Sequence, residues 1–174
     1  VALAAERLHR MGAVPLARRA VDVLATPLHL ADTPELGGGL YWNDDHDFKN
    51  VPATAPTAIF LARTGQPARA HRLVDWLYGR LVDPDSGLVL DGLRIGPDGS
   101  TTLVRDVYTY NQGTVLGALV ELGDPVSLDR AARLIAATRS HLTTDADRRL
   151  LRTHGGGDGG LFTGIHVRYL ALAA

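Results

Sequence analysis

The sequence predicts an all-α protein built from helical hairpins, an (α/α)6 toroid of which about half of the ring is present. Two observations lead to this prediction. The chain repeats one pattern, in which an apolar helix, a short turn of Gly and Pro, and an amphipathic helix follow one another. The helix before each turn is apolar on nearly all sides, whereas the helix after it has a single apolar stripe. Helices of the first kind suit an inner layer and helices of the second kind an outer layer.

Short turns separate the two helices of each hairpin, at residues 12–15, 65–67 and 123–125. Each turn begins with Gly, which suits the left-handed residue that ends a helix. Each turn ends with Pro, which suits the first turn of the next helix. Connections as short as these require the two helices of a hairpin to run antiparallel.

The expected helices follow in order along the chain. The inner helices precede residue 12 and cover residues 55–61, 115–120 and 161–174. The outer helices carry apolar stripes with i, i+3, i+4, i+7 spacing. These stripes are Ala17, Ala20, Val21 and Leu24, then Ala70, Leu73, Val74, Leu77 and Leu81, then Leu128, Ala131, Ala132 and Ile135. Because the last inner helix has no outer partner, we expect residues 1–174 to be one segment of a toroid domain, truncated at both ends.

One long stretch, residues 83–107, does not follow the repeat. Within it, residues 88–95 and 101–104 alternate as strands do, and a turn rich in Gly and Pro at residues 96–99 joins them. We therefore expect a small β-hairpin on a loop of the third helical hairpin.

Composition excludes several classes of function. The chain has 18 Lys and Arg against 19 Asp and Glu, a formal charge of −1, so no nucleic-acid or anionic-membrane partner is expected. No apolar run is long enough to span a bilayer. The absence of cysteine excludes Cys-ligated metals, and the seven histidines lack a metal-binding spacing, so we expect no metal and no cofactor.

Polar and aromatic residues gather in the loops that lead into the inner helices, at residues 37–50, 108–113 and 155–164. These loops share one topological position, so their side chains are expected to line one end of the ring. An aromatic ring stacks on the C–H face of a sugar, and amides and carboxylates bind its hydroxyls. The candidate substrate-binding residues are Trp42, Asn50, Tyr110, Asn111, Gln112, Asp158 and Phe162.

Simpler roles are open for some of these residues. Asn50 and Asn111 precede helices, so each could act as an N-cap as well as bind sugar. Trp42 could belong to the core, and Trp76, on an outer helix, is expected to pack. The adjacent Asp44 and Asp45 are expected to be a solvated part of the loop and not a catalytic pair.

Three motifs in this order resemble glycoside hydrolase family 76, the α-1,6-mannanase family. They are Gly37-Gly-Gly-Leu-Tyr-Trp42 followed by Lys49-Asn50, Thr109-Tyr-Asn-Gln-Gly113, and Asp158-Gly-Gly-Leu-Phe-Thr-Gly-Ile165 with Arg168-Tyr-Leu170. The resemblance implies an (α/α)6 toroid that hydrolyses α-1,6-linked mannan by a retaining mechanism, for which two carboxylates lie about 5–5.5 Å apart. It also implies a secreted or cell-envelope location.

The catalytic residues are expected outside this chain. The family resemblance implies an adjacent Asp pair at the entry to the first inner helix, hence upstream of Val1, and this segment alone is then expected to be inactive. One alternative is a non-catalytic carbohydrate-binding protein on the same toroid. Another is a different (α/α)6 enzyme, such as a sugar epimerase or an unsaturated glucuronyl hydrolase.

Overall fold

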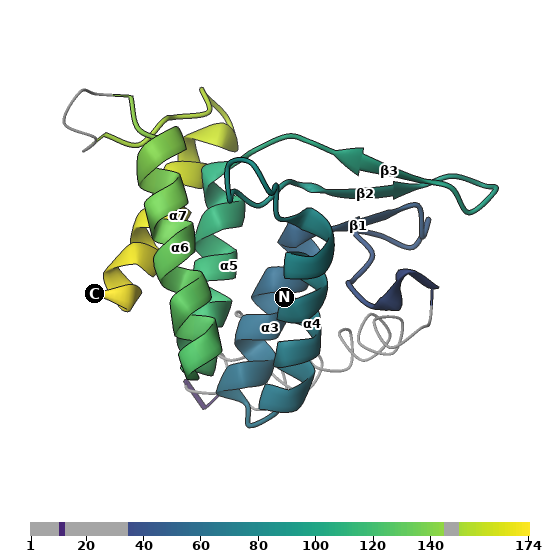
Figure 1. The fold of residues 1–174 in the computed structure, drawn as a ribbon, viewed down its shortest axis with the longest axis horizontal. Helices are drawn as coiled ribbons and strands as arrows, with labels where there is room; N and C mark the ends of the chain where they lie inside the picture. The colour runs from purple at the N-terminus through teal and green to yellow at the C-terminus, as the bar shows by residue number, and fades with distance from the viewer. Residues whose placement is uncertain (1–10, 13–34, 145–149) are drawn as a thin grey trace.

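The computed structural model describes residues 11–12, 35–144 and 150–174 of the chain (Figure 1). Its helices are α3 (Val51–Arg63), α4 (Pro67–Leu81), α5 (Thr109–Leu122), α6 (Pro125–His141) and α7 (Gly159–Ala173), preceded by a short 3-10 helix, η1 (Glu35–Gly37). The two hairpins α3–α4 and α5–α6 and the inner helix α7 confirm the predicted helical repeat. The first predicted hairpin lies outside the described residues, apart from Gly12, whose φ of 77° is left-handed as its turn requires.

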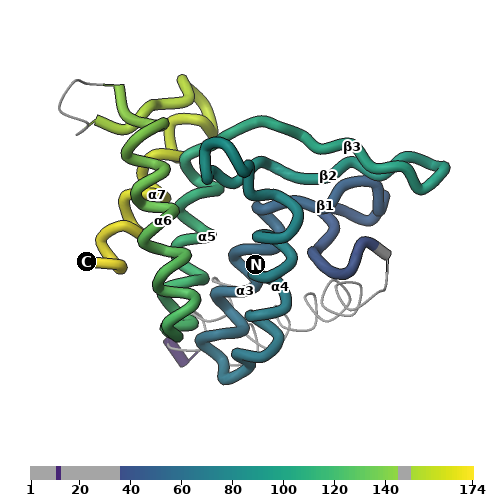
Figure 2. The backbone as a smooth tube through the Cα atoms, in the orientation of Figure 1, coloured from purple at the N-terminus to yellow at the C-terminus, as the bar shows by residue number. Residues whose placement is uncertain are grey.

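The helices form two layers. Helices α3, α5 and α7 lie side by side in the inner layer, and α4 and α6 cover them (Figure 2). Helix α5 is central, with every residue from 111 to 119 buried. The predicted stripe of α4 is confirmed: Ala70, Leu73, Val74, Leu77 and Leu81 are all buried.

The predicted stripe of α6 is wrong in part. Of its four residues only Ala131 is buried, and Leu128 is 48% exposed. The buried face is instead Ser127, Ala131, Leu134 and Thr138, which keeps helical spacing but includes two hydroxyl residues. A search for apolar spacing overlooks such residues, although the hydroxyl group of Ser127 is satisfied by donating to Asp124 at 2.5 Å.

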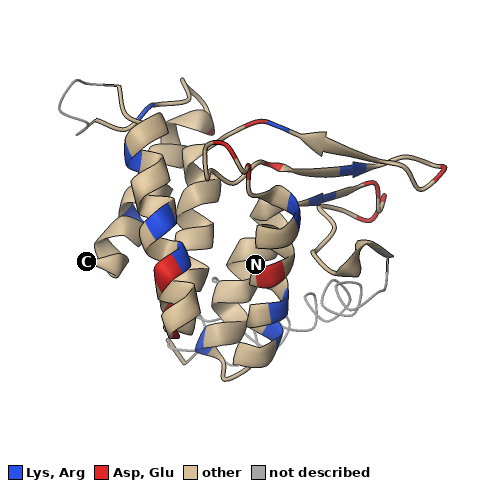
Figure 3. Cartoon of the chain, viewed as in Figure 1, with Lys and Arg blue, Asp and Glu red and all other residues tan. Residues whose placement is uncertain are grey.

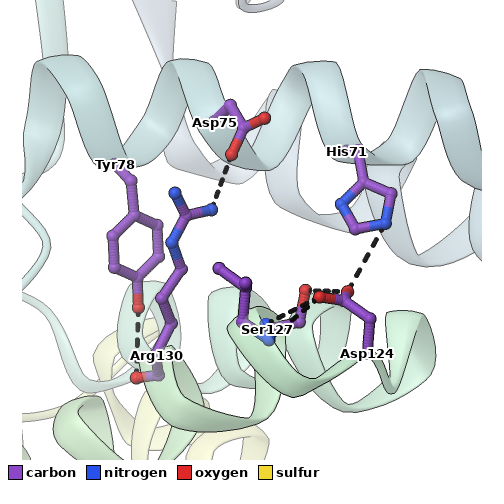
Figure 4. Close-up of polar contacts among 7 residues, drawn as sticks. His71, Asp75, Tyr78, Asp124, Ser127 and Arg130 are labelled. Atoms are coloured by element: carbon purple, nitrogen blue, oxygen red, sulfur yellow. Dashed lines mark hydrogen bonds and ion pairs between the residues drawn. The ribbon is translucent and has the colours of Figure 1, made fainter.

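Polar contacts join the two outer helices (Figure 4). Asp124 caps α6 by accepting from the backbone N–H groups of Val126 and Ser127, and it lies 3.4 Å from His71 of α4. The hydrogen bond from the hydroxyl group of Ser127 is the main cause that lowers the pKa of Asp124. Arg130 of α6 also donates to Asp75 of α4 at 2.6 Å, so a second polar contact joins the two outer helices.

A three-stranded antiparallel sheet lies at the end of the bundle where the inner helices begin (Figure 1). Its strands are β1 (Phe48–Asn50), β2 (Gly92–Ile95) and β3 (Thr101–Val104), in the order β1-β2-β3. The predicted β-hairpin is confirmed for β2 and β3. Residues 88–91 precede the sheet, and β1 was not predicted because three residues are too few to show a strand pattern.

Charged residues follow the same division into layers. Lys, Arg, Asp and Glu are concentrated on α4, on α6 and on the loops of the sheet, whereas the visible faces of the inner helices carry few (Figure 3). An ion pair between Arg63 and Glu121 joins the C-terminal ends of α3 and α5. Among the described residues, no helix is both long and apolar enough to cross a membrane.

His166 of α7 is buried in the contact with α5, and among the described residues neither of its ring nitrogens has a hydrogen-bond partner. Burial lowers the pKa of His166 from 6.5 to about 4. The unfolded chain therefore takes up this proton first as the pH falls, so the folded state loses stability between pH 6.5 and 4.

We predict that His166→Leu makes the free energy of unfolding less sensitive to acid. Between pH 7 and pH 5 the wild-type protein should lose about 2 kcal/mol more than the variant, as measured by urea unfolding at each pH. His141→Leu, at the exposed end of α6, is the matched control and should retain the acid loss. An equal loss in wild type and His166→Leu would contradict the prediction.

Candidate functional site

The N-terminal ends of α3, α5 and α7 lie at one end of the molecule, together with the sheet (Figure 1). The motif-bearing loops that lead into these helices therefore share one end, as their position in the repeat predicts. At the beginnings of α5 and α7 they form a cluster of four rings, Tyr108, Tyr110, His154 and Phe162. The ring centroids are 4.3 Å apart for Tyr110 and Phe162 and 5.5 Å apart for Tyr108 and Tyr110.

The aromatic cluster contains two of the predicted residues, Tyr110 and Phe162. His154 lies 5.5 Å from Phe162 and 5.6 Å from Tyr108, again between ring centroids. All four rings are partly exposed, so the cluster offers aromatic surface to a ligand. An aromatic platform of this kind suits the apolar face of a sugar.

A carboxylate lies against this cluster. Asp91, immediately before β2, accepts a hydrogen bond from Nδ2 of Asn111 at 2.9 Å and a second one from the hydroxyl group of Tyr110. Burial raises the pKa of Asp91, and the nearby charge of Asp106 adds to the shift, while the hydrogen bonds from Asn111 and Tyr110 oppose it. The side chain is half-buried, so its remaining lone pairs can accept from the hydroxyl groups of a ligand.

Asn111 and Gln112, both predicted to bind sugar, are fully buried. Asn111 is the third residue of α5, so its alternative role as an N-cap is wrong, and its Oδ1 has no partner among the described residues. Gln112 donates from Nε2 to the carbonyl groups of Val89 and Tyr108 and accepts at Oε1 from the N–H group of Val89. A direct contact of Gln112 with sugar does not fit this arrangement, because both of its N–H donors are in use.

His154 caps the beginning of α5. Its Nε2 accepts from the backbone N–H of Thr109 at 3.1 Å, which requires the ring to be neutral. Burial lowers the pKa of His154, and the positive charge of Arg152 lowers it further. Both shifts favour the neutral ring, which can accept this hydrogen bond. The hydrogen bond links the loop before α7 to the beginning of α5.

The loop before β1 is anchored to α3 and α4. Asn50 is the N-cap of α3, accepting from the N–H group of Ala53 at 3.0 Å, so the capping role is confirmed. The fully buried Lys49 donates from Nζ to the carbonyl of Gly38 at 2.8 Å. Trp76 is buried as expected, and a side chain at Gly39 would meet its ring at 2.6 Å, so this position requires glycine for packing.

Trp42 and Asp158 are exposed. Trp42 lies on the loop before β1, where its backbone N–H donates to the carbonyl of Phe48. The residue is 58% exposed, so it does not belong to the core. In Figure 1 this loop and α7 lie on opposite sides of the molecule. Asp158 directly precedes α7, and its side chain makes no capping hydrogen bond.

Sequence reasoning missed Asp91, Tyr108 and His154. Asp91 lies within residues 88–95, for which the sequence predicts a strand, and its place beside α5 depends on a contact between residues 20 positions apart. Tyr108 belongs to the same loop as Tyr110, and its aromatic neighbour was the signal that could have identified it. Within the described ranges, no group of three or more metal-ligating side chains occurs.

Comparison with known proteins assigns the family. Residues 14–174 match the sequence profile of glycosyl hydrolase family 76, and the chain belongs to this family. A search of curated protein sequences finds no match. The fold is similar to that of an α-1,6-mannanase from Salegentibacter sp. HEL1_6, with a TM-score of 0.83 and 31% identity over 99% of this chain and 54% of that one.

Two further structures are similar. An inactive variant of the Salegentibacter enzyme, with two adjacent aspartates replaced by asparagine, was solved in complex with α-1,6-mannotriose; it has a TM-score of 0.83 and 30% identity over 99% of this chain and 54% of that one. A protein of Listeria innocua has a TM-score of 0.80 and 30% identity, over 97% of this chain and 51% of that one. The chain thus spans about half the length of the structures it matches.

Proposed function

We propose that this chain forms part of a glycoside hydrolase that acts on α-1,6-linked mannan. The observation that carries the proposal is the pairing of an aromatic platform, Tyr110 and Phe162, with a carboxylate, Asp91, held by Tyr110 and Asn111. The platform would stack on one sugar ring while Asp91 accepts from its hydroxyl groups. Membership of family 76 and the mannotriose complex of a relative support mannan as the substrate.

The proposed mechanism is retaining and uses two carboxylates. One would attack the anomeric carbon as nucleophile, and the other would first protonate the leaving oxygen and then activate water. We expect this pair to be the adjacent aspartates that the family resemblance places upstream of Val1. The inactive relative, in which two adjacent aspartates are replaced, supports such a pair.

The residues of this chain would bind and orient the sugar. Tyr110 and Phe162 would contact a sugar ring, and Asp91 would bind its hydroxyls. Asp158 and Trp42 are both exposed, and they would contact sugar units other than the one bound at the cluster. Asn50, Asn111 and Gln112 would act by holding the loops and side chains that touch the substrate.

The test is hydrolysis of linear α-1,6-mannan by the intact protein, followed as released reducing ends. We predict that Tyr110→Ala lowers kcat/KM by at least tenfold, because the stacking of a sugar on one ring and one hydrogen bond to Asp91 are lost together. Tyr78→Ala, on the outer layer, is the matched control and should leave kcat/KM within about threefold, even if the protein melts earlier. Unchanged hydrolysis in Tyr110→Ala would refute the assigned site.

The same assay separates the alternative function. A carbohydrate-binding protein on this fold would bind α-1,6-mannotriose, with loss of affinity in Tyr110→Ala, yet release no reducing ends. That result would keep the binding site and reject the hydrolase.

A further inference from the structure

Gln112 has the contacts of a strand partner, although it belongs to a helix. It is fully buried in the first turn of α5. Its side-chain amide accepts a hydrogen bond from the N–H of Val89 and donates one to the carbonyl of Val89, each at 2.8 Å. Its second N–H donates to the carbonyl of Tyr108 at 3.1 Å. The amide of Gln112 therefore replaces the backbone that a neighbouring strand would supply.

The path of residues 88–90 explains why such a partner is needed. The carbonyl of Leu88 accepts from Asp83, and the N–H of Leu90 donates to Leu81, so these groups face the end of α4. In extended backbone the groups of the intervening residue face the other way, toward α5. Without Gln112, the N–H and the carbonyl of the fully buried Val89 would both lose their partner.

Two residues after Val89 comes Asp91, the carboxylate of the proposed site. Its carbonyl accepts from the N–H of Val51 at 2.9 Å, at the beginning of α3. Its side chain meets Asn111, the neighbour of Gln112 in α5. The first turn of α5 is therefore hydrogen-bonded to residues 89–91 at two points, from Gln112 to Val89 and from Asn111 to Asp91.

We propose that Gln112 is a positioning residue that fixes Asp91 against Asn111 and Tyr110 by holding Val89, and that it does so without touching the substrate. This inference rests on the proposed function for its effect on mannan hydrolysis, and on the geometry of the free protein for the placement of Asp91. When the hydrogen bonds between Gln112 and Val89 are lost, the segment that carries Asp91 is no longer fixed. The carboxylate then does not meet Asn111 and Tyr110 in a single orientation.

The first test is a double-mutant cycle in the intact protein, with linear α-1,6-mannan as substrate. Gln112→Met keeps the length of the side chain and removes its three hydrogen bonds, and we expect kcat/KM to fall at least tenfold. In an Asp91→Asn background the same change should cost less than threefold, because the group that it positions is already altered. Equal losses in both backgrounds would overturn the proposal.

A control separates positioning from general stability. Ser127→Ala removes a hydrogen bond from a buried side chain of α6, a helix that carries no residue of the proposed site, and should lower the melting temperature while kcat/KM stays unchanged. If Gln112→Met does not fold, Gln112→Glu replaces it in the cycle. It keeps the size and the acceptor for Val89 and removes both N–H donors.

The second test needs no substrate. The carboxyl group of Asp91 is titrated by NMR in the wild-type protein and in Gln112→Met. We expect its pKa to move toward the ordinary aspartate value in the variant, since the segment opens to water, and an unchanged titration would overturn the positioning role. If the wild-type protein does not hydrolyse mannan, the proposed function fails, while this titration still decides the role of Gln112.

Discussion

Asp91→Ala should lower kcat/KM for linear α-1,6-mannan by about a hundredfold in the intact protein. Hydrogen bonds to a charged group contribute about 1.5–3 kcal/mol, and the upper part of this range corresponds to a hundredfold. The variant also leaves Nδ2 of the fully buried Asn111 without its acceptor. Asp98→Asn, in the turn between β2 and β3, is the matched control and should leave kcat/KM within about twofold, because its partner is Ser100 of the same turn.

The pH dependence gives a second readout of Asp91. Burial raises its pKa, so the carboxylate takes up a proton at a higher pH than an ordinary aspartate does. We expect kcat/KM to fall on the acid side as this proton is bound, and Asp91→Asn to abolish that part of the profile. If Asp91→Asn had the kcat/KM of the wild-type protein, or the same fall in kcat/KM at acid pH, Asp91 would not belong to the site.

Gly113→Ala should destabilise the protein by about 2–3 kcal/mol, a typical cost of overpacking. A side chain at Gly113 of α5 would lie 2.6 Å from the Cα of His166 and 3.1 Å from the carbonyl oxygen of Ile165, both backbone atoms of α7. Backbone cannot turn aside as a side chain can, so α7 must move away from α5. Because Phe162 moves with α7, we also expect the contact with Tyr110 to loosen and mannan hydrolysis to fall.

The control for this prediction is Gly164→Ala on α7, where nothing lies within 4 Å of the added carbon. There the substitution should stabilise the protein by about 0.5–1 kcal/mol, because alanine favours a helix over glycine. Urea unfolding of both variants measures the difference. Stabilisation by Gly113→Ala would contradict the close contact between α5 and α7.

The hairpins could be predicted because their signals are local. The left-handed Gly123 ends α5, and Asp124 and Pro125 begin α6, so three adjacent residues define both helix boundaries. The stripe of α4 is apolar throughout and was found, whereas the buried face of α6 contains Ser127 and Thr138 and was misread. The hydroxyl group of Ser127 is buried because it donates to Asp124, and hydropathy alone does not reveal that partner. Thr138 buries a hydroxyl group that has no partner among the described residues, so its place on this face follows from packing and not from polarity.

The site was predictable only in part, for a related reason. Tyr110 and Phe162 carry their chemistry in their side chains, and the repeat places their loops at one end, so their proximity followed from topology. The roles of Gln112 and Asp91 depend on which backbone groups lie opposite them. The sequence predicts that Gln112 binds sugar, but its side-chain amide is hydrogen-bonded to the backbone of Val89 in an extended segment.

The most direct test of the account is a crystal structure of the intact protein with α-1,6-mannotriose. We predict a mannose ring against Tyr110 and Phe162, with at least one of its hydroxyl groups within hydrogen-bonding distance of Asp91 and with Gln112 still bonded to Val89. A mannotriose bound away from this cluster, or bound with Asp91 making no contact to sugar, would contradict the account.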